Sequence, residues 1–202
     1  GFNHEEAISC FKHALKFDPK CAMAYWGIAY ALGPNYNKTW DAFDEAEFKI
    51  ALAAAHENTS KAISLIDGVS ELEQALIYSL QHRYPKGESN TDTNRWMKHY
   101  SSKMREIYNQ FPEDPDVSTL VAEALMNPTP WELWDLKTGE IADGANTAEV
   151  MLILEGALRR IDETNQEKHP GLLHMYIHLM EMSPYPERAL KAADQLRNLV
   201  PD

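Results

Sequence analysis

The chain has 202 residues, of which 44% are hydrophobic and 25% are charged, a composition typical of globular proteins and unlike that of disordered ones. Its formal net charge of −12 would repel nucleic-acid phosphates and anionic lipid surfaces, so neither is expected as a partner. The longest apolar runs, such as residues 50–55, fall far short of the roughly 20 residues that a membrane-spanning helix needs.

Helical periodicity dominates the sequence, and no alternation with period two is long enough to predict a strand. Nine helices are expected, over about residues 3–16, 22–32, 40–66, 70–83, 93–110, 115–126, 147–161, 170–182 and 186–199. The predicted fold class is therefore all-α.

The helix boundaries in the first half of the chain follow local signals. Asn3 is placed to cap the first helix, and Asp18-Pro19 ends it. Gly33-Pro34 ends the second helix, and Asp67-Gly68 ends a long third helix that is rich in alanine. The fourth helix stops before the Tyr-Pro-Lys-Gly sequence of residues 84–87.

The second half contains one long irregular segment. Pro115 suits the first turn of the sixth helix, and residues 127–146 then form a loop of a length that is often functional. Trp131 and Trp134, within this loop, are expected to cap the core. Because the other connections are mostly short, the helices should pack as an antiparallel stack.

The two cysteines, Cys10 and Cys21, belong to no CxxC pair, which excludes a disulfide-rich secreted scaffold. We expect reduced thiols, although a single bridge between neighbouring segments stays open. The chain begins without Met on a segment with helical character and ends where another helix pair would begin. We therefore expect a piece of a longer polypeptide, in which the lack of targeting signals carries little weight.

Small and bulky side chains recur at fixed intervals near both ends of the chain. The first set is Ala7, Phe11, Ala14 and Pro19, and the second is Ala189, Ala193, Leu196 and Pro201. A small residue lets two helices approach, a bulky one fills the gap, and proline ends the unit. Enlarging Ala7 or Ala14 to leucine should therefore overpack the first helix pair.

This pattern resembles the tetratricopeptide repeat, most clearly over residues 6–33 and 170–201. The resemblance implies one helical-repeat domain over residues 1–202, in which degenerate helix pairs stack as a right-handed superhelix. It also implies a concave groove lined by the first helix of each pair, here the helices that begin at residues 22, 115 and 170. The groove positions of this register are Met23, Trp26, Tyr30, Thr119, Glu123, His174 and His178.

The groove predicts a protein or peptide partner. Members of the family that clamp a chaperone's carboxylate tail use Lys, Arg and Asn in the groove, and none stands at these positions, so that ligand is disfavoured. Trp26 and Tyr30 would instead pack an apolar or extended peptide. Under this leading hypothesis we expect no cofactor and assign no catalytic residue.

A second hypothesis is a divalent transition-metal site on the helix that begins at Pro170. His174 and His178 are four residues apart, a spacing that lets two imidazoles on one helix face reach one metal ion. Glu181 follows on the same face, and His169 and Glu123 are further candidate ligands.

The metal hypothesis has a plain alternative, in which His174 and His178 are polar groove residues that contact a partner or a carboxylate. The pair is not part of an HExxH motif, so no general base stands between the ligands. If a metal is bound, the protein would be a metalloprotein, and a hydrolase or an oxygenase are the enzyme classes to consider.

Overall fold

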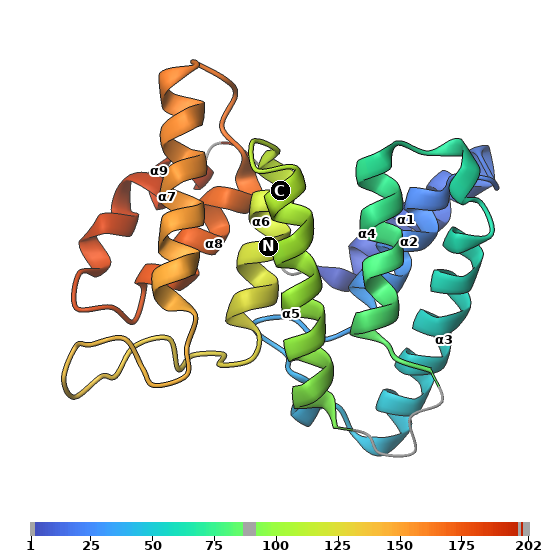
Figure 1. The fold of residues 1–202 in the computed structure, drawn as a ribbon, viewed down its shortest axis with the longest axis horizontal. Coiled ribbons are helices and arrows are strands. Elements are labelled where there is room, and N and C mark those ends of the chain that lie inside the picture. Colours follow the sequence, from blue (N-terminus) through green and yellow to red (C-terminus); the bar gives the residue numbers. More distant parts are fainter. Residues whose placement is uncertain (1–2, 87–91, 198, 200–202) are drawn as a thin grey trace. The chain divides into compact units, whose positions relative to one another are not determined.

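The computed structural model describes residues 3–86, 92–197 and 199, and this part of the chain is all-α, as predicted. Figure 1 shows the nine α-helices of these residues. Their bounds are α1 His4–Phe17, α2 Ala22–Ala31, α3 Glu45–Ile63, α4 Glu71–Arg83, α5 Thr93–Gln110, α6 Pro115–Met126, α7 Thr147–Glu163, α8 Pro170–Met180 and α9 Leu190–Arg197. Three short 3₁₀ segments accompany them, namely η1 Trp40–Ala42, η2 Ile66–Gly68 and η3 Pro186–Ala189.

Side-chain caps explain where several helices begin. The Asn3 side chain accepts a hydrogen bond from the Glu6 amide at the start of α1, as predicted. Ser70 and Glu73 form a reciprocal capping box at the start of α4. The Asp114 side chain caps α6, which carries proline in its first turn.

Two predicted helices are divided in the structure. The segment 40–66 is not one helix, because the Asp44 side chain accepts from the Glu47 amide and starts α3 after the separate segment η1. Likewise, η3 precedes α9 in the segment 186–199. Periodicity alone does not reveal such breaks, since the apolar pattern continues across them.

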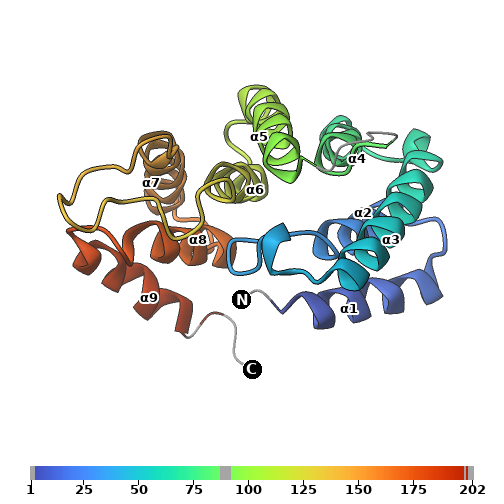
Figure 2. The ribbon, with the colours of Figure 1, turned by 90° about the horizontal axis from the view of Figure 1, so that it is seen from below.

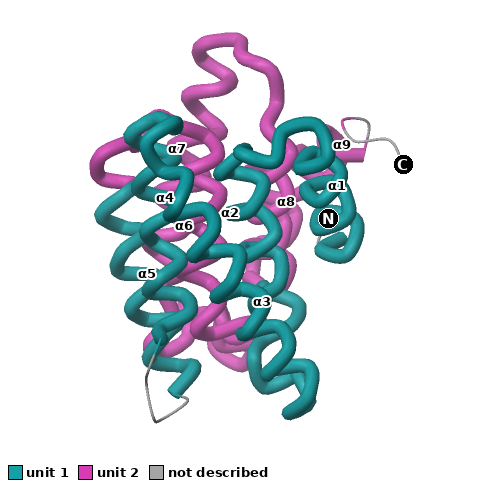
Figure 3. Tube along the Cα trace, turned by 90° about the vertical axis from the view of Figure 1, so that its right-hand side faces the viewer, with its two compact units in different colours: residues 1–107 teal, residues 108–202 magenta. Residues whose placement is uncertain are grey.

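The chain divides into two compact units, residues 1–107 and residues 108–202, which Figure 3 draws in different colours. Among the described residues, no helix combines the length and the apolar character that crossing a bilayer requires.

Helix α2 is the centre of the first unit, since it contacts α1, α3 and α4. Phe11 of α1 lies so close to Gly27 of α2 that a Cβ at Gly27 would overlap its ring. Ala29, at the position where the register requires a small residue, is fully buried. Ala14 is exposed, however, so the prediction that Ala14→Leu overpacks this helix pair is wrong. It faces solvent because α1 buries only the side that carries Phe11 and Leu15.

Helix α8 is the centre of the second unit and contacts α6, α7 and α9, as Figure 2 shows. Ala122, Leu125 and Met180 are fully buried, in agreement with the register. Ile177 is only half-buried, so the eighth position of the register is less enclosed in α8 than it is in α2 and α6. The last register position, Pro201, lies outside the described residues.

The long loop between α6 and α7 is anchored to the second unit rather than free. The Trp134 indole is buried and donates a hydrogen bond to the Leu179 carbonyl of α8, at 2.7 Å. The Thr147 hydroxyl donates to the Leu133 carbonyl, also at 2.7 Å. Trp131 is 45% exposed, so only Trp134 covers the core as predicted.

Candidate functional site

In the first unit, the predicted groove residues are held by contacts within the unit. The Trp26 indole donates to the Leu76 carbonyl of α4 at 3.1 Å and stacks on Tyr30, with ring centroids 5.1 Å apart. Met23 is half-buried and packs against the cluster of Ala22, Ala62 and Ile77. Helix α4 therefore covers much of this face of α2, and the prediction that these residues bind a partner stays a prediction.

Arg83, at the end of α4, is a buried charge that the periodicity did not single out. Its guanidinium donates to the Pro34 carbonyl and the Tyr84 hydroxyl, and it lies over the rings of Tyr30 and Tyr100, 4.5 and 4.9 Å from their centroids. The Tyr84 hydroxyl in turn donates to the Ala29 carbonyl at 2.7 Å. Carbonyl oxygens and aromatic faces thus replace water around the cation.

The first unit also contains a cavity of about 540 Å³ between the start of α1, the loop after α2 and α3. Lys38 forms an ion pair with Glu47 at this cavity and lies over the Phe43 ring, 4.2 Å from its centroid. Ile50 stands at the edge of the cavity and is largely exposed.

In the second unit, His169 joins α6 to α8. Its Nδ1 accepts a hydrogen bond from the Leu172 amide at 3.2 Å, and its Nε2 lies 3.0 Å from Oδ1 of Asp116. Hydrogen bonding to His169 lowers the pKa of the Asp116 carboxyl. Helices α6 and α8 approach closely beside this contact. A Cβ on Gly171 would lie only 2.7 Å from Cγ2 of Thr119, so glycine leaves the room that the approach needs. His169 therefore acts as a helix cap and a bridge.

Glu123 is buried in α6, and Asn127 donates to its carboxyl at 3.5 Å. Burial raises the pKa of this carboxyl to about 7, because the charged form loses its hydration. This carboxyl therefore keeps its proton to a higher pH than an exposed glutamate does.

His174 and His178 lie together on α8, as the spacing predicted. Their Nε2 atoms are 2.9 Å apart, and their rings tilt by 42° with centroids 4.7 Å apart. Nδ1 of His178 is 2.8 Å from Oε1 of Glu181. Burial is the main cause that lowers the pKa of His174 to about 4, and the neighbouring His178 adds to it. His174 is therefore neutral at physiological pH.

The structure brings only part of the predicted metal cluster together. Within the described ranges, no three side chains of His, Cys, Asp or Glu gather in a way that could hold a metal ion. His174 and His178 face each other, whereas Glu181 contacts the outer nitrogen of His178, His169 caps α8, and Glu123 is buried beside Asn127.

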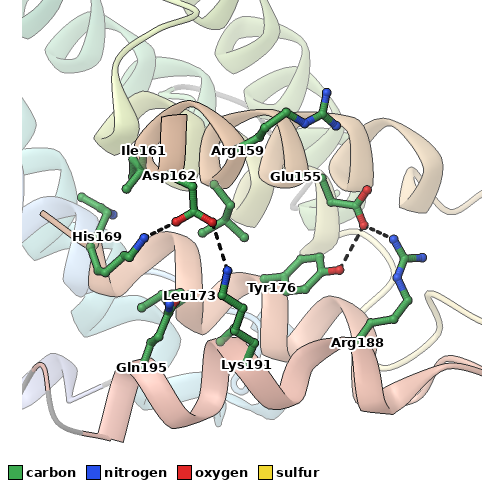
Figure 4. Close-up of a pocket in the computed structure, with 13 residues that line it drawn as sticks. Glu155, Arg159, Ile161, Asp162, His169, Leu173, Tyr176, Arg188, Lys191 and Gln195 are labelled. Atoms are coloured by element: carbon green, nitrogen blue, oxygen red, sulfur yellow. Dashed lines mark hydrogen bonds and ion pairs between the residues drawn. The ribbon is translucent and has the colours of Figure 1, made fainter. Parts of the chain in front are cut away.

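A cavity of about 310 Å³ lies between α7, α8 and the segment η3–α9 (Figure 4). Two carboxylates of α7 organise its lining. Asp162 pairs with Lys168 and Lys191, and these hydrogen bonds lower the pKa of its carboxyl. Glu155 pairs with Arg188 and accepts a hydrogen bond from the Tyr176 hydroxyl at 3.0 Å. These polar contacts tie the three helices together.

Neither this cavity nor the partner of His169 was predicted from the residues. Glu155 and Asp162 are seven residues apart and so share one helix face, which was an available signal. Asp116 and His169 are 53 residues apart, and no local pattern links them.

The chain matches no family model, no curated protein and no solved structure. Its function is therefore inferred from its own residues.

Proposed function

We propose that this protein is an interaction module of the tetratricopeptide type, which binds a segment of another protein along α6 and α8. The observation that carries the proposal is that α6 and α8, the first helices of successive pairs, pack directly against each other. In arrays of this type such helices line the concave face, and we propose that the helix pairs continue as a right-handed superhelix.

The side chains on these two helices suit an extended polypeptide. Thr119, His174 and His178 are half-buried, so each keeps part of its surface exposed and available for contact with a ligand. Asp116 in the first turn of α6 and Glu181 at the C-cap of α8 are exposed carboxylates. Together with the net charge of −12, they favour a segment that carries lysine or arginine.

The test is selection of binding peptides from a random library displayed on phage, followed by affinity measurement with synthetic peptides. We expect the selected peptides to be cationic and to bind more weakly as salt concentration rises. Asp116→Lys combined with Glu181→Lys should weaken binding at least about tenfold, because two attractive charges become repulsive.

The matched control is Glu132→Lys combined with Glu163→Lys, which changes the net charge equally at exposed positions in the loop and at the end of α7. The control should retain affinity. Equal losses in both double variants, or selected peptides without positive charge, would contradict the proposal.

A further inference from the structure

We propose that His174 and His178 are two protein ligands of one divalent transition-metal ion. The residues are also groove residues in the proposed function, but the ligand belongs to a different class, so metal binding and peptide binding are tested by different measurements. It rests on the positions of three side chains of α8 and its C-cap, His174, His178 and Glu181.

The separation of the two imidazole nitrogens fits a shared metal. Metal–imidazole bonds are about 2.0–2.1 Å long, so two of them at the right angle of a square-planar Cu²⁺ or Ni²⁺ ion put the nitrogens about 2.9 Å apart, whereas the tetrahedral angle of Zn²⁺ separates them by about 3.3 Å. The Nε2 atoms of His174 and His178 are 2.9 Å apart. The distance therefore suits two adjacent ligands of a square-planar ion, and the rings must turn so that both Nε2 atoms point at the ion instead of at each other.

Glu181 selects the tautomer of His178 that can bind a metal. Its carboxylate is 2.8 Å from Nδ1 of His178 and can only accept, so Nδ1 carries the proton and Nε2 keeps its lone pair. A carboxylate on the outer nitrogen of a ligating histidine is the usual second partner at metal sites, where it orients the ring and increases its basicity.

The proton balance is simple. In the metal-free protein, Nε2 of His174 donates its hydrogen to Nε2 of His178, because the latter has none. On metal binding this proton moves to Nδ1 of His174, and both imidazoles stay neutral. No net proton is released by the pair.

The chemistry of the donors indicates which ions bind. Imidazole suits copper, nickel and zinc, whereas magnesium and calcium require oxygen ligands. With two protein ligands, water completes the coordination, so the ion should exchange readily. Affinity should follow the general order in which Cu²⁺ exceeds both Ni²⁺ and Zn²⁺.

The experiment is titration of the untagged full chain with Cu²⁺ and Zn²⁺ against a chromogenic chelator, with the copper site followed by electron paramagnetic resonance. We expect one equivalent of metal and hyperfine structure from two nitrogens. Excess Mg²⁺ should not compete. His174→Gln combined with His178→Gln should remove this equivalent, and circular dichroism should show that the variant keeps its helices.

The matched control is His13→Gln combined with His99→Gln, which changes two exposed histidines on other helices, and this variant should still bind one equivalent of metal.

Glu181→Gln should weaken the affinity for the metal about tenfold, because it removes the negative charge that accepts the hydrogen bond from Nδ1 of His178. A copper spectrum that is the same in wild type and in the His174/His178 variant would overturn the site. Unchanged affinity in Glu181→Gln would overturn the positioning role of Glu181. Peptide affinity is measured separately, so either proposal can fail alone.

Discussion

Glu123 shows how burial changes the chemistry of one side chain. An exposed glutamate at this position would be ionised at neutral pH, but burial in α6 raises the pKa of its carboxyl from 4.5 to about 7. The folded state therefore retains a proton that the unfolded state has lost between these pH values.

This shift predicts how stability depends on pH. Because the folded state binds more protons between pH 4.5 and about 7, Glu123 makes the free energy of unfolding fall as pH rises through this window. Glu123→Gln, which keeps the shape and stays neutral, should remove this fall and stabilise the protein at pH 8 by at most about 3 kcal/mol. Urea unfolding of both proteins from pH 4 to 8 measures the difference. Parallel stability profiles would contradict the assignment.

Gly33 leaves room for the Tyr84 side chain. The sequence suggested a helix-ending glycine, and the structure adds that a Cβ at Gly33 would overlap the Tyr84 hydroxyl. That hydroxyl bonds the Ala29 carbonyl and Arg83, so it cannot move without breaking the contacts around the buried cation.

We expect Gly33→Ala to lower the free energy of unfolding by about 1–3 kcal/mol, as overpacking usually does. Gly68→Ala is the control, because no atom lies within 4 Å of the position a Cβ would take there. Chemical denaturation should place the control within about 0.5 kcal/mol of the wild-type protein. Similar losses in both variants would mean that glycine is needed for backbone reasons alone.

At the scale of helices, the register of small and bulky residues was partly right. Phe11 and Ala29 pack where the pattern expects them, but the small residue that lets α1 approach α2 is Gly27. Spacing identifies which helices pair, whereas the side that each helix turns to its partner depends on the packing angle.

The α1–α2 contact can be tested with one substitution on each side of α1. Gly27→Ala should cost about 1–3 kcal/mol, because its methyl group would overlap the Phe11 ring. Ala14→Leu should be nearly neutral, since Ala14 is exposed. Thermal unfolding of the two variants measures both effects, and a larger loss for Ala14→Leu would show that α1 is rotated from its position here.

At the scale of the whole chain, the helices of the second unit are held together by contacts within that unit. Helix α6 packs on α7 and α8, and α8 packs on α9, with Leu154, Leu172 and Leu179 fully buried. Contacts of this kind, between successive helices, favour independent folding of a unit.

We expect a fragment of residues 108–202 to be helical and to unfold cooperatively. A fragment of residues 127–202, which lacks α6, should lose the cooperative transition because α7 and α8 lose a packing partner. Circular dichroism during thermal unfolding measures both. A gradual transition in the longer fragment would show that unit 2 depends on the rest of the chain.

The all-α class, most helix boundaries and the pairing of His174 with His178 were predictable from the residues alone. These features arise from interactions over a few positions, such as the Asn3 cap and the four-residue spacing of the two histidines, which a linear pattern records.

The surroundings of the predicted site residues required the folded chain. Trp26 lies under α4, His169 bonds Asp116, and Arg83 is enclosed by Pro34 and aromatic rings. The bonds of Trp26 to Leu76, His169 to Asp116 and Arg83 to Pro34 each join residues about 50 positions apart, where helix packing rather than local periodicity determines which side chains meet.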